Sequence, residues 1–126
     1  PTPYIIKEEK DVPLQMKGQD VFKFAVKAAG KDISRALEEA GHSADDVDHY
    51  LVHQANIRII NAIQDYLGQP GEKFPTNIAD HGNSSSSCCP MLLDECNRSG
   101  LLKRGDLIAI SAFGAGFVSG AVLLEW

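Results

Sequence analysis

The pattern of apolar and polar positions predicts a long amphipathic helix near the start of the chain. Over residues 18–40 the apolar side chains recur every three or four positions, which places them on one helical face. These side chains are Phe22, Ala25, Ala29, Ile33, Ala36, Leu37 and Ala40. Gly30 lies inside the segment and favours a kink or a break, because glycine lowers helix propensity. Gly41 marks the end of the helix.

The rest of the chain alternates strand and helix patterns that are separated by Gly, Pro and polar residues. Short apolar runs predict strands, and segments with a single apolar face predict helices. In chain order these segments are a capped turn at 43–46, a strand at 50–52, a helix at 56–67, a short strand at 74–77, a helix from 86–89 to about 99, and strands at 107–113 and 118–124. Only residues 114–116 join the last two strands, and so short a link implies an antiparallel hairpin.

The alternation of strand and helix patterns predicts an α/β fold in which helices pack on a mixed sheet. A chain of 126 residues suits a single domain, which we expect over residues 18–126. Residues 1–17 contain three prolines and charges of both signs, a composition typical of a lead-in or linker. Residues 14–16 within it are a candidate for a short strand.

Composition and charge narrow the classes of function. Apolar residues make up 44% of the chain and charged residues 23%, as in an ordinary globular protein. No apolar run is long enough to span a membrane, and the net charge of −5 argues against a general nucleic-acid-binding protein. Residues 7–10 are all charged, which does not fit the apolar core of a signal peptide. Together with an odd number of cysteines, three, these features predict a cytoplasmic protein with reduced thiols.

Two segments carry side chains suited to chemistry. His53 follows the strand at 50–52, and sites in α/β proteins gather where strands end. Asn83 follows the short strand at 74–77 and precedes a helix. If these strands are neighbours, a neutral imidazole and an amide can donate to one oxygen and stabilise an enolate or oxyanion. Taken singly, each residue has a commoner structural role, as a core histidine or a helix cap.

The cysteines have simpler explanations than chemistry. Cys88 and Cys89 lie at a predicted helix start, where the helix dipole lowers a thiol pKa and favours a nucleophile. Cysteine is nevertheless most often a small core residue, and we expect that role for both of them and for Cys96. A zinc site with His42 or His81 is not favoured, because the chain lacks a C-x-x-C pair.

Taken together, these features resemble the β-ketoacyl-acyl-carrier-protein synthase III family, which consists of condensing enzymes with the thiolase fold. The resemblance covers nearly everything after residue 13. Its matching positions are Met16–Gly18, Val21–Phe24, His53–Ile60, His81–Ser84, Pro90, Leu93–Glu95, Ala112–Phe117, Gly120 and Trp126. It implies the carboxy-terminal half of a thiolase-like fold, with helices on a mixed sheet that ends in an antiparallel hairpin.

The resemblance also implies a reaction. Members of this family start bacterial fatty-acid synthesis by joining an acyl group, taken from an acyl-coenzyme A, to malonyl-acyl-carrier-protein with loss of carbon dioxide. His53 and Asn83 match the catalytic pair, whose hydrogen bonds to the malonyl thioester oxygen would stabilise the enolate. Neutral donors suit this decarboxylation, since it needs stabilisation of charge rather than a strong base. No cofactor and no metal are expected.

Further positions take supporting roles from the resemblance. Asn56 matches a polar active-site residue, and Phe113 matches a phenylalanine that shields the site. The backbone amide of Ala115 matches an oxyanion donor, and Arg58 matches a position for docking of the acyl carrier protein. The expected partners are therefore the acyl carrier protein and, in a full-length enzyme, a second copy in a homodimer.

The chain departs from the family pattern at two points. The family usually has Asn-Thr-Ser-Ala-Ala-Ser before an apolar residue and Pro, whereas residues 83–90 read Asn-Ser-Ser-Ser-Ser-Cys-Cys-Pro. The resemblance gives no role to Cys88 or Cys89. The nucleophilic Cys of the family belongs to an amino-terminal half that this sequence does not contain. We therefore expect a fragment that is inactive alone and that exposes an apolar face and self-associates.

Two other functions remain open at the level of sequence. One is a related condensing enzyme of polyketide or other secondary metabolism, because the motifs do not set the acyl specificity. The other is a non-catalytic module that binds carrier protein, for which Arg58 would be the contact.

Overall fold

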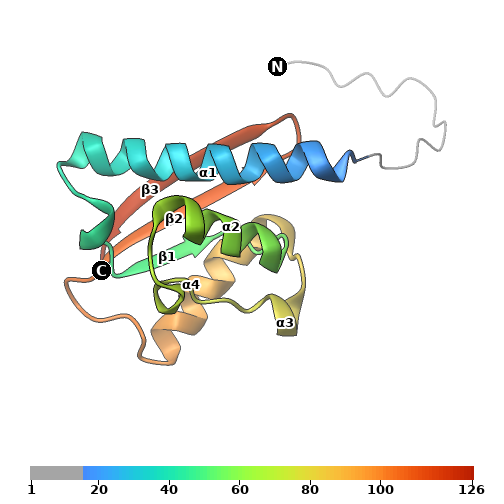
Figure 1. Ribbon diagram of the computed structural model, residues 1–126. Coiled ribbons are helices and arrows are strands. Elements are labelled where there is room, and N and C mark those ends of the chain that lie inside the picture. The colour runs from blue at the N-terminus through green and yellow to red at the C-terminus, as the bar shows by residue number, and fades with distance from the viewer. Residues whose placement is uncertain (1–15) are drawn as a thin grey trace, which may run out of the picture.

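Four α-helices and three strands form the regular structure of residues 16–126, the part of the chain that the computed structural model describes (Figure 1). The helices are α1 (Gly18–Ala40), α2 (Ile57–Leu67), α3 (Ile78–His81) and α4 (Cys88–Arg98), and the strands are β1 (His49–Val52), β2 (Leu107–Gly114) and β3 (Val118–Glu125). Short 3-10 turns lie at η1 (Ala44–Asp46), η2 (Gly71–Lys73) and η3 (Ser85–Ser87). Leu14 and Gln15, from the candidate strand at 14–16, lie outside the described residues.

The three strands form a mixed sheet in the order β1-β2-β3. β1 runs parallel to β2, with Tyr50 opposite Ala109. β2 runs antiparallel to β3, and the hairpin closes between Gly114 and Val118. A parallel pair needs a long crossover, and here the segment with α2, α3 and α4 supplies it. The predicted mixed sheet and the terminal hairpin are therefore confirmed.

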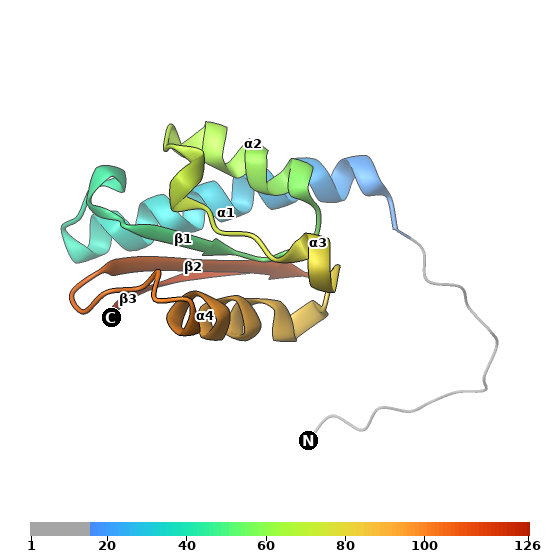
Figure 2. The ribbon, with the colours of Figure 1, turned by 90° about the horizontal axis from the view of Figure 1, so that it is seen from below.

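Helices cover both faces of the sheet, as Figure 2 shows. α1 and α2 lie on one face, where Ile33, Ile63 and Tyr50 are fully buried in the larger core cluster. α4 lies on the other face, where Leu92 and Cys96 pack with Leu51 and Ile108 of the strands. Adjacent strand residues thus face opposite layers, as strand geometry requires. Within residues 16–126, no helix combines the length and the apolar character needed to cross a membrane.

α1 continues through Gly30 without a break, which differs from the kink or break expected there. Gly30 is buried at the crossing of α1 and α2. A Cβ atom at this position would collide with the ring of Tyr66 on α2. The glycine therefore serves close helix packing, and tertiary contacts offset its low helix propensity.

The short strand expected at residues 74–77 is wrong. Phe74 is buried and its ring stacks on Tyr50, with ring centroids 4.6 Å apart. Pro75 has no amide hydrogen for a strand ladder. The amide of Asn77 donates to the side-chain Oε1 of Gln54 at 3.2 Å instead of to a strand. Phe74 and Asn77 are thus held by core packing and by a side-chain hydrogen bond rather than by a strand ladder.

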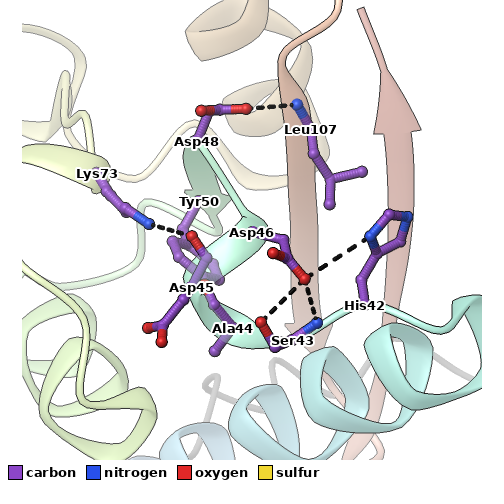
Figure 3. Close-up of polar contacts among 9 residues, drawn as sticks. All are labelled: His42, Ser43, Ala44, Asp45, Asp46, Asp48, Tyr50, Lys73 and Leu107. Carbon is purple, nitrogen blue, oxygen red and sulfur yellow. Dashed lines mark hydrogen bonds and ion pairs between the residues drawn. The ribbon is translucent and has the colours of Figure 1, made fainter.

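The turn before β1 is held by a capping box, which confirms the capped turn predicted at 43–46. Figure 3 shows Asp46 accepting hydrogen bonds from the backbone amide of Ser43 at 2.7 Å and from its hydroxyl at 2.9 Å. These two donors hold the pKa of Asp46 below its ordinary value. The hydroxyl of Tyr50 donates to the carbonyl of Ala44 at 2.7 Å and ties the same turn to the strand.

The start of β1 is also fixed to its neighbours. The backbone amide of Asp48 donates to the Leu107 carbonyl at 2.8 Å. The Asp48 carboxylate accepts from the Leu107 amide at 2.8 Å, as Figure 3 shows. Lys73 of η2 donates to the carbonyl of Asp45 at 3.0 Å. These contacts set the register in which β1 enters the sheet.

On the face of the sheet that packs against α4, side chains of β3 remain exposed. Val122 pairs with Ile110, which packs in the α4 cluster, so both residues face the α4 side. Val118 lies on the same face because strand side chains alternate. Val118 and Val122 are 66% and 55% exposed, and Phe117 at the hairpin turn is 57% exposed.

Candidate active site

His53 lies directly beyond the end of β1, and its backbone continues the strand pairing. Its amide donates to the Ser111 carbonyl of β2 at 2.8 Å. The following residue, Gln54, is fully buried and donates to the Val52 carbonyl at 2.8 Å. These bonds fix the backbone on both sides of His53, so its side chain is carried by a rigid strand end.

Asn83 lies in the turn between α3 and η3. The preceding residue, Gly82, has φ 63° and ψ −155°, a backbone conformation that residues with a Cβ atom rarely adopt. The side-chain Oδ1 of Asn83 accepts from the backbone amide of Ser85 at 3.0 Å. A backbone amide can only donate, so Oδ1 is the acceptor of this bond, and the Asn83 NH₂ group donates to none of residues 16–126.

One cavity of about 540 Å³ brings His53 and Asn83 together. The residues that line it come from the ends of β1 and β2 and from the start of α4: His53, Asn83, Ser85, Ser86, Cys88, Cys89, Ala112, Phe113 and Gly114. The sequence analysis expected the two side chains to meet through neighbouring strands. They face one cavity although residues 74–77 form no strand.

Gln54 links the two segments, and the sequence analysis missed it. Its amide NH₂ group holds the end of β1 through Val52, and its Oε1 accepts from the amide of Asn77, just before α3. The same side chain therefore bridges the strand that carries His53 to the turn that leads to Asn83. A buried glutamine directly after an apolar strand was the available signal, because buried amides are almost always hydrogen-bonded.

Glu95 of α4 anchors α3 from the other side. Its carboxylate accepts from the Asn77 side chain at 2.8 Å and lies 2.6 Å from Nε2 of His81. The hydrogen bond from Asn77 and the contact with His81 lower the pKa of Glu95. His81 thus pairs with a carboxylate, and among residues 16–126 no three His, Cys, Asp or Glu side chains are grouped to hold a metal.

The surroundings of His53 keep its ring neutral. The ring is half-buried and meets the edge of Phe113, with centroids 5.1 Å apart and planes at 73°. Burial lowers the pKa of His53 below its ordinary value. Nδ1 lies 2.6 Å from Sγ of Cys88, the first residue of α4. A neutral imidazole has one N–H donor to offer.

The cysteines are buried to different degrees. Cys88 and Cys96 are buried, and Cys89 is partly buried. Burial, followed by the neighbouring Cys88, raises the pKa of Cys89 to about 12. Its Sγ lies 4.0 Å from the Ser111 carbonyl, where it is a weak donor as a thiol. Cys89 is therefore protonated at neutral pH and is a poor nucleophile.

Of the remaining candidate residues, only Phe113 lines this cavity. Ala115 lies in the exposed turn directly after its lining residue Gly114. Asn56 caps α2 by accepting from the amide of Arg58 at 2.8 Å, and it lines a separate cavity with Ile57 and Thr76. Arg58 is exposed in the first turn of α2.

Comparison with known proteins gives a consistent result. Residues 37–126 match the family described as 3-oxoacyl-[acyl-carrier-protein] synthase III C terminal. A β-ketoacyl-[acyl-carrier-protein] synthase III from Synechococcus sp. (strain WH7803) is 46% identical over 114 residues, which cover 90% of this chain and 34% of that protein. The chain thus spans about a third of the length of this relative.

Solved structures share the same fold. The crystal structure of 3-oxoacyl-[acyl-carrier-protein] synthase III from Aquifex aeolicus VF5 is 43% identical with a TM-score of 0.87, over 89% of this chain and 36% of that one. The priming β-ketosynthase of the R1128 polyketide biosynthetic pathway is 36% identical with a TM-score of 0.77, over 88% and 34%. These similarities confirm the carboxy-terminal half of a thiolase-like fold. On this evidence the chain belongs to the 3-oxoacyl-[acyl-carrier-protein] synthase III family, as its carboxy-terminal domain.

Proposed function

We propose that this chain is the carboxy-terminal catalytic part of a β-ketoacyl-acyl-carrier-protein synthase III, which condenses an acyl group with malonyl-acyl-carrier-protein. The observation that carries this proposal is the common cavity of His53 and Asn83. One side chain is a neutral imidazole and the other an amide with a free NH₂ group. Two neutral donors beside one cavity suit a reaction that develops negative charge on an oxygen.

The proposed step is a decarboxylation. His53 Nε2–H and the Asn83 amide donate to the thioester oxygen of the malonyl group. The bond between the α-carbon and the carboxylate breaks, its electron pair forms the enolate, and carbon dioxide leaves. The α-carbon then attacks the thioester carbonyl of the acyl group, whose thiolate departs as the new carbon–carbon bond forms. The donors act most strongly on the enolate, because it carries more charge than the ground-state thioester.

The walls of the cavity support this role. The rings of Phe113 and His53 meet edge to face, so Phe113 covers part of the imidazole with apolar surface. A drier site strengthens each hydrogen bond to the developing oxyanion. In the proposal Phe113 shields the site and the backbone amide of Ala115 is an oxyanion donor for acyl transfer. Asn56 contributes through its cap on α2, which directly follows the segment of His53.

The partners follow from the same proposal. The acyl-carrying thiol belongs to an amino-terminal half of the kind that completes the longer relatives, and the complete enzyme is a homodimer. Arg58 is exposed on α2 and would receive the acidic carrier protein. The two thioester substrates carry the activated carbons, so no further cofactor is proposed. The three free cysteines fit a reducing cytoplasm.

A reconstitution experiment tests the proposal. Condensation of acetyl-coenzyme A with malonyl-acyl-carrier-protein is measured for this chain alone and with a separately produced amino-terminal half of the Synechococcus relative. We expect product only in the mixture, and none when His53→Ala replaces the native chain. Product from this chain alone, abolished by Cys88→Ser or Cys89→Ser, would place the nucleophile in this chain. No product from a mixture that forms a stable complex would count against the proposal.

A second candidate is a priming ketosynthase of polyketide synthesis. The observation in its favour is the similarity to the R1128 enzyme. The two candidates share the decarboxylation and differ in the acyl group that is loaded. A panel of acyl-coenzyme A donors separates them when the amino-terminal half comes from the same enzyme as this chain, since preference for acetyl favours fatty-acid initiation and preference for another acyl group favours the second candidate.

A further inference from the structure

The contact between His53 and Cys88 is the shortest polar contact of the cavity's side chains. Nδ1 of His53 and Sγ of Cys88 are 2.6 Å apart. The nearest sulfur, Sγ of Cys89, lies at 3.8 Å from that of Cys88. A thiol has a single proton to donate, and the distances favour the imidazole over the second sulfur as its acceptor.

The position of Cys88 is rigid. It is the first residue of α4, it is only 2% exposed, and it packs between the helix and the end of β1. The segment before it is fixed as well, because Asn83 holds the amide of Ser85. Cys88 lines the cavity but exposes little surface, and its short contact with His53 makes it well placed to hold that ring.

The protonation state of the His53 ring follows from its surroundings. Among the described residues that line the cavity, Cys88 and Cys89 are the only titratable groups besides His53. Cys89 is a neutral thiol, since burial raises its pKa to about 12. Burial also lowers the pKa of His53, so the ring is neutral and one of its nitrogens accepts. That nitrogen is Nδ1 when the Cys88 thiol donates to it.

We propose that Cys88 is a positioning residue, whose thiol donates to Nδ1 of His53 and holds the imidazole in the tautomer with its proton on Nε2. This inference rests on the proposed function, because only that tautomer gives His53 a donor for the enolate. Cys88 stands where the family pattern usually has Ser, and a hydroxyl is also a donor. The chain thus keeps the donor while changing its chemistry from oxygen to sulfur.

Nitrogen-15 NMR of the imidazole tests the inference on this chain without substrate or partner. At neutral pH the native chain and Cys88→Ser should both show Nε2 protonated and Nδ1 unprotonated for His53. Cys88→Ala and Cys88→Val, which lack a donor, should show a mixture of the two tautomers. Their His53 pKa should rise by roughly half to one pH unit, the size expected from loss of one hydrogen bond to the neutral ring. Cys89→Ala is the matched control and should leave the tautomer unchanged.

Two results would overturn the inference. Protonation of both ring nitrogens in the native chain at neutral pH would mean a thiolate–imidazolium pair, and removal of Cys88 would then lower the His53 pKa. An unchanged tautomer in Cys88→Ala or Cys88→Val would mean that the thiol does not select it. If the apolar variants fail to fold, the His53 tautomer measured in the native chain and in Cys88→Ser still tests the inference. Failure here leaves the proposed function standing, whereas an active His53→Ala mixture would remove the function and leave the tautomer result intact.

Discussion

The two ends of β1 use polar side chains in opposite ways. At the amino end, the side chains of Asp46, Asp48 and Tyr50 are each paired with a nearby backbone group (Figure 3). At the carboxyl end, His53 and Asn83 line a cavity, and the hydrogen bond from the Ser85 amide uses only Oδ1 of Asn83. Paired groups stabilise the fold, while donors that line a cavity remain available to a ligand. The contrast supports the proposal that the carboxyl end is the functional one.

The largest effect is expected from removing the imidazole. His53→Ala in the reconstituted mixture should lower the rate of malonyl decarboxylation by about 100-fold or more, because one of the two enolate donors is lost. Loading of the acyl group should change much less. Separate assays of carbon dioxide release and acyl transfer measure the two steps, and an equal loss in both would contradict the enolate role.

Removal of the second donor should have a similar or somewhat smaller effect. Asn83→Ala should lower decarboxylation by roughly 100-fold, the usual cost of one oxyanion donor. The matched control is Asn61→Ala, which removes an exposed amide on α2 away from the cavity. If His53→Ala and Asn83→Ala both decarboxylate malonyl-acyl-carrier-protein at the native rate, the carboxyl end of β1 is not the site of this reaction.

A substitution at the amino end of β1 should change the stability of the fold rather than the rate of the reaction. Tyr50→Phe removes the hydrogen bond to Ala44, at a cost of about 1 kcal/mol in the free energy of unfolding. Urea denaturation of this chain at pH 8 measures it. The same variant in the reconstituted mixture should keep its decarboxylation rate, and a large loss of rate would show that the two ends are coupled.

Tyr50 should also make the free energy of unfolding depend on pH in the alkaline range. Burial raises its pKa from 10.0 to about 12. A pKa raised by folding means that the stabilising contribution is complete below pH 10 and is lost as the pH rises from 10 to 12. The full loss is roughly 3 kcal/mol, and Tyr50→Phe should remove this dependence. Denaturation at pH 8 and pH 11 measures it, and an identical pH profile of both proteins would contradict the assignment.

The smallest effect is expected at the exposed capping box. Asp46→Asn should lower the melting temperature of this chain slightly, because a charged acceptor of the Ser43 amide becomes a neutral one. Folding lowers the pKa of Asp46, so its contribution is present above about pH 4 and is lost as the pH falls through its folded pKa. Asp46→Asn should therefore differ from the native chain at pH 7 and converge with it at acidic pH. A constant difference across this range would contradict the prediction.

The sequence by itself determined the layers of this fold and the identity of the two donors. Apolar spacing predicted α1 and α2, and the apolar runs predicted β1 and the terminal hairpin, because burial of a helix face or a strand leaves a pattern in the chain. Pro90 and Gly100 marked the two ends of α4. The two residues of the proposed catalytic pair were selected from their position at strand and helix ends, together with the motifs of the resemblance.

Only the tertiary structure decided how the two donors come together. Residues 74–77 were expected to form a strand, yet Gln54 and Glu95 pair the polar groups of Asn77 and so orient the turn that leads to Asn83. The contact between Cys88 and His53 joins residues 35 positions apart. Such contacts are single hydrogen bonds between residues far apart in the sequence. Unlike the burial of a helix or strand face, they leave no periodic pattern from which they could be predicted.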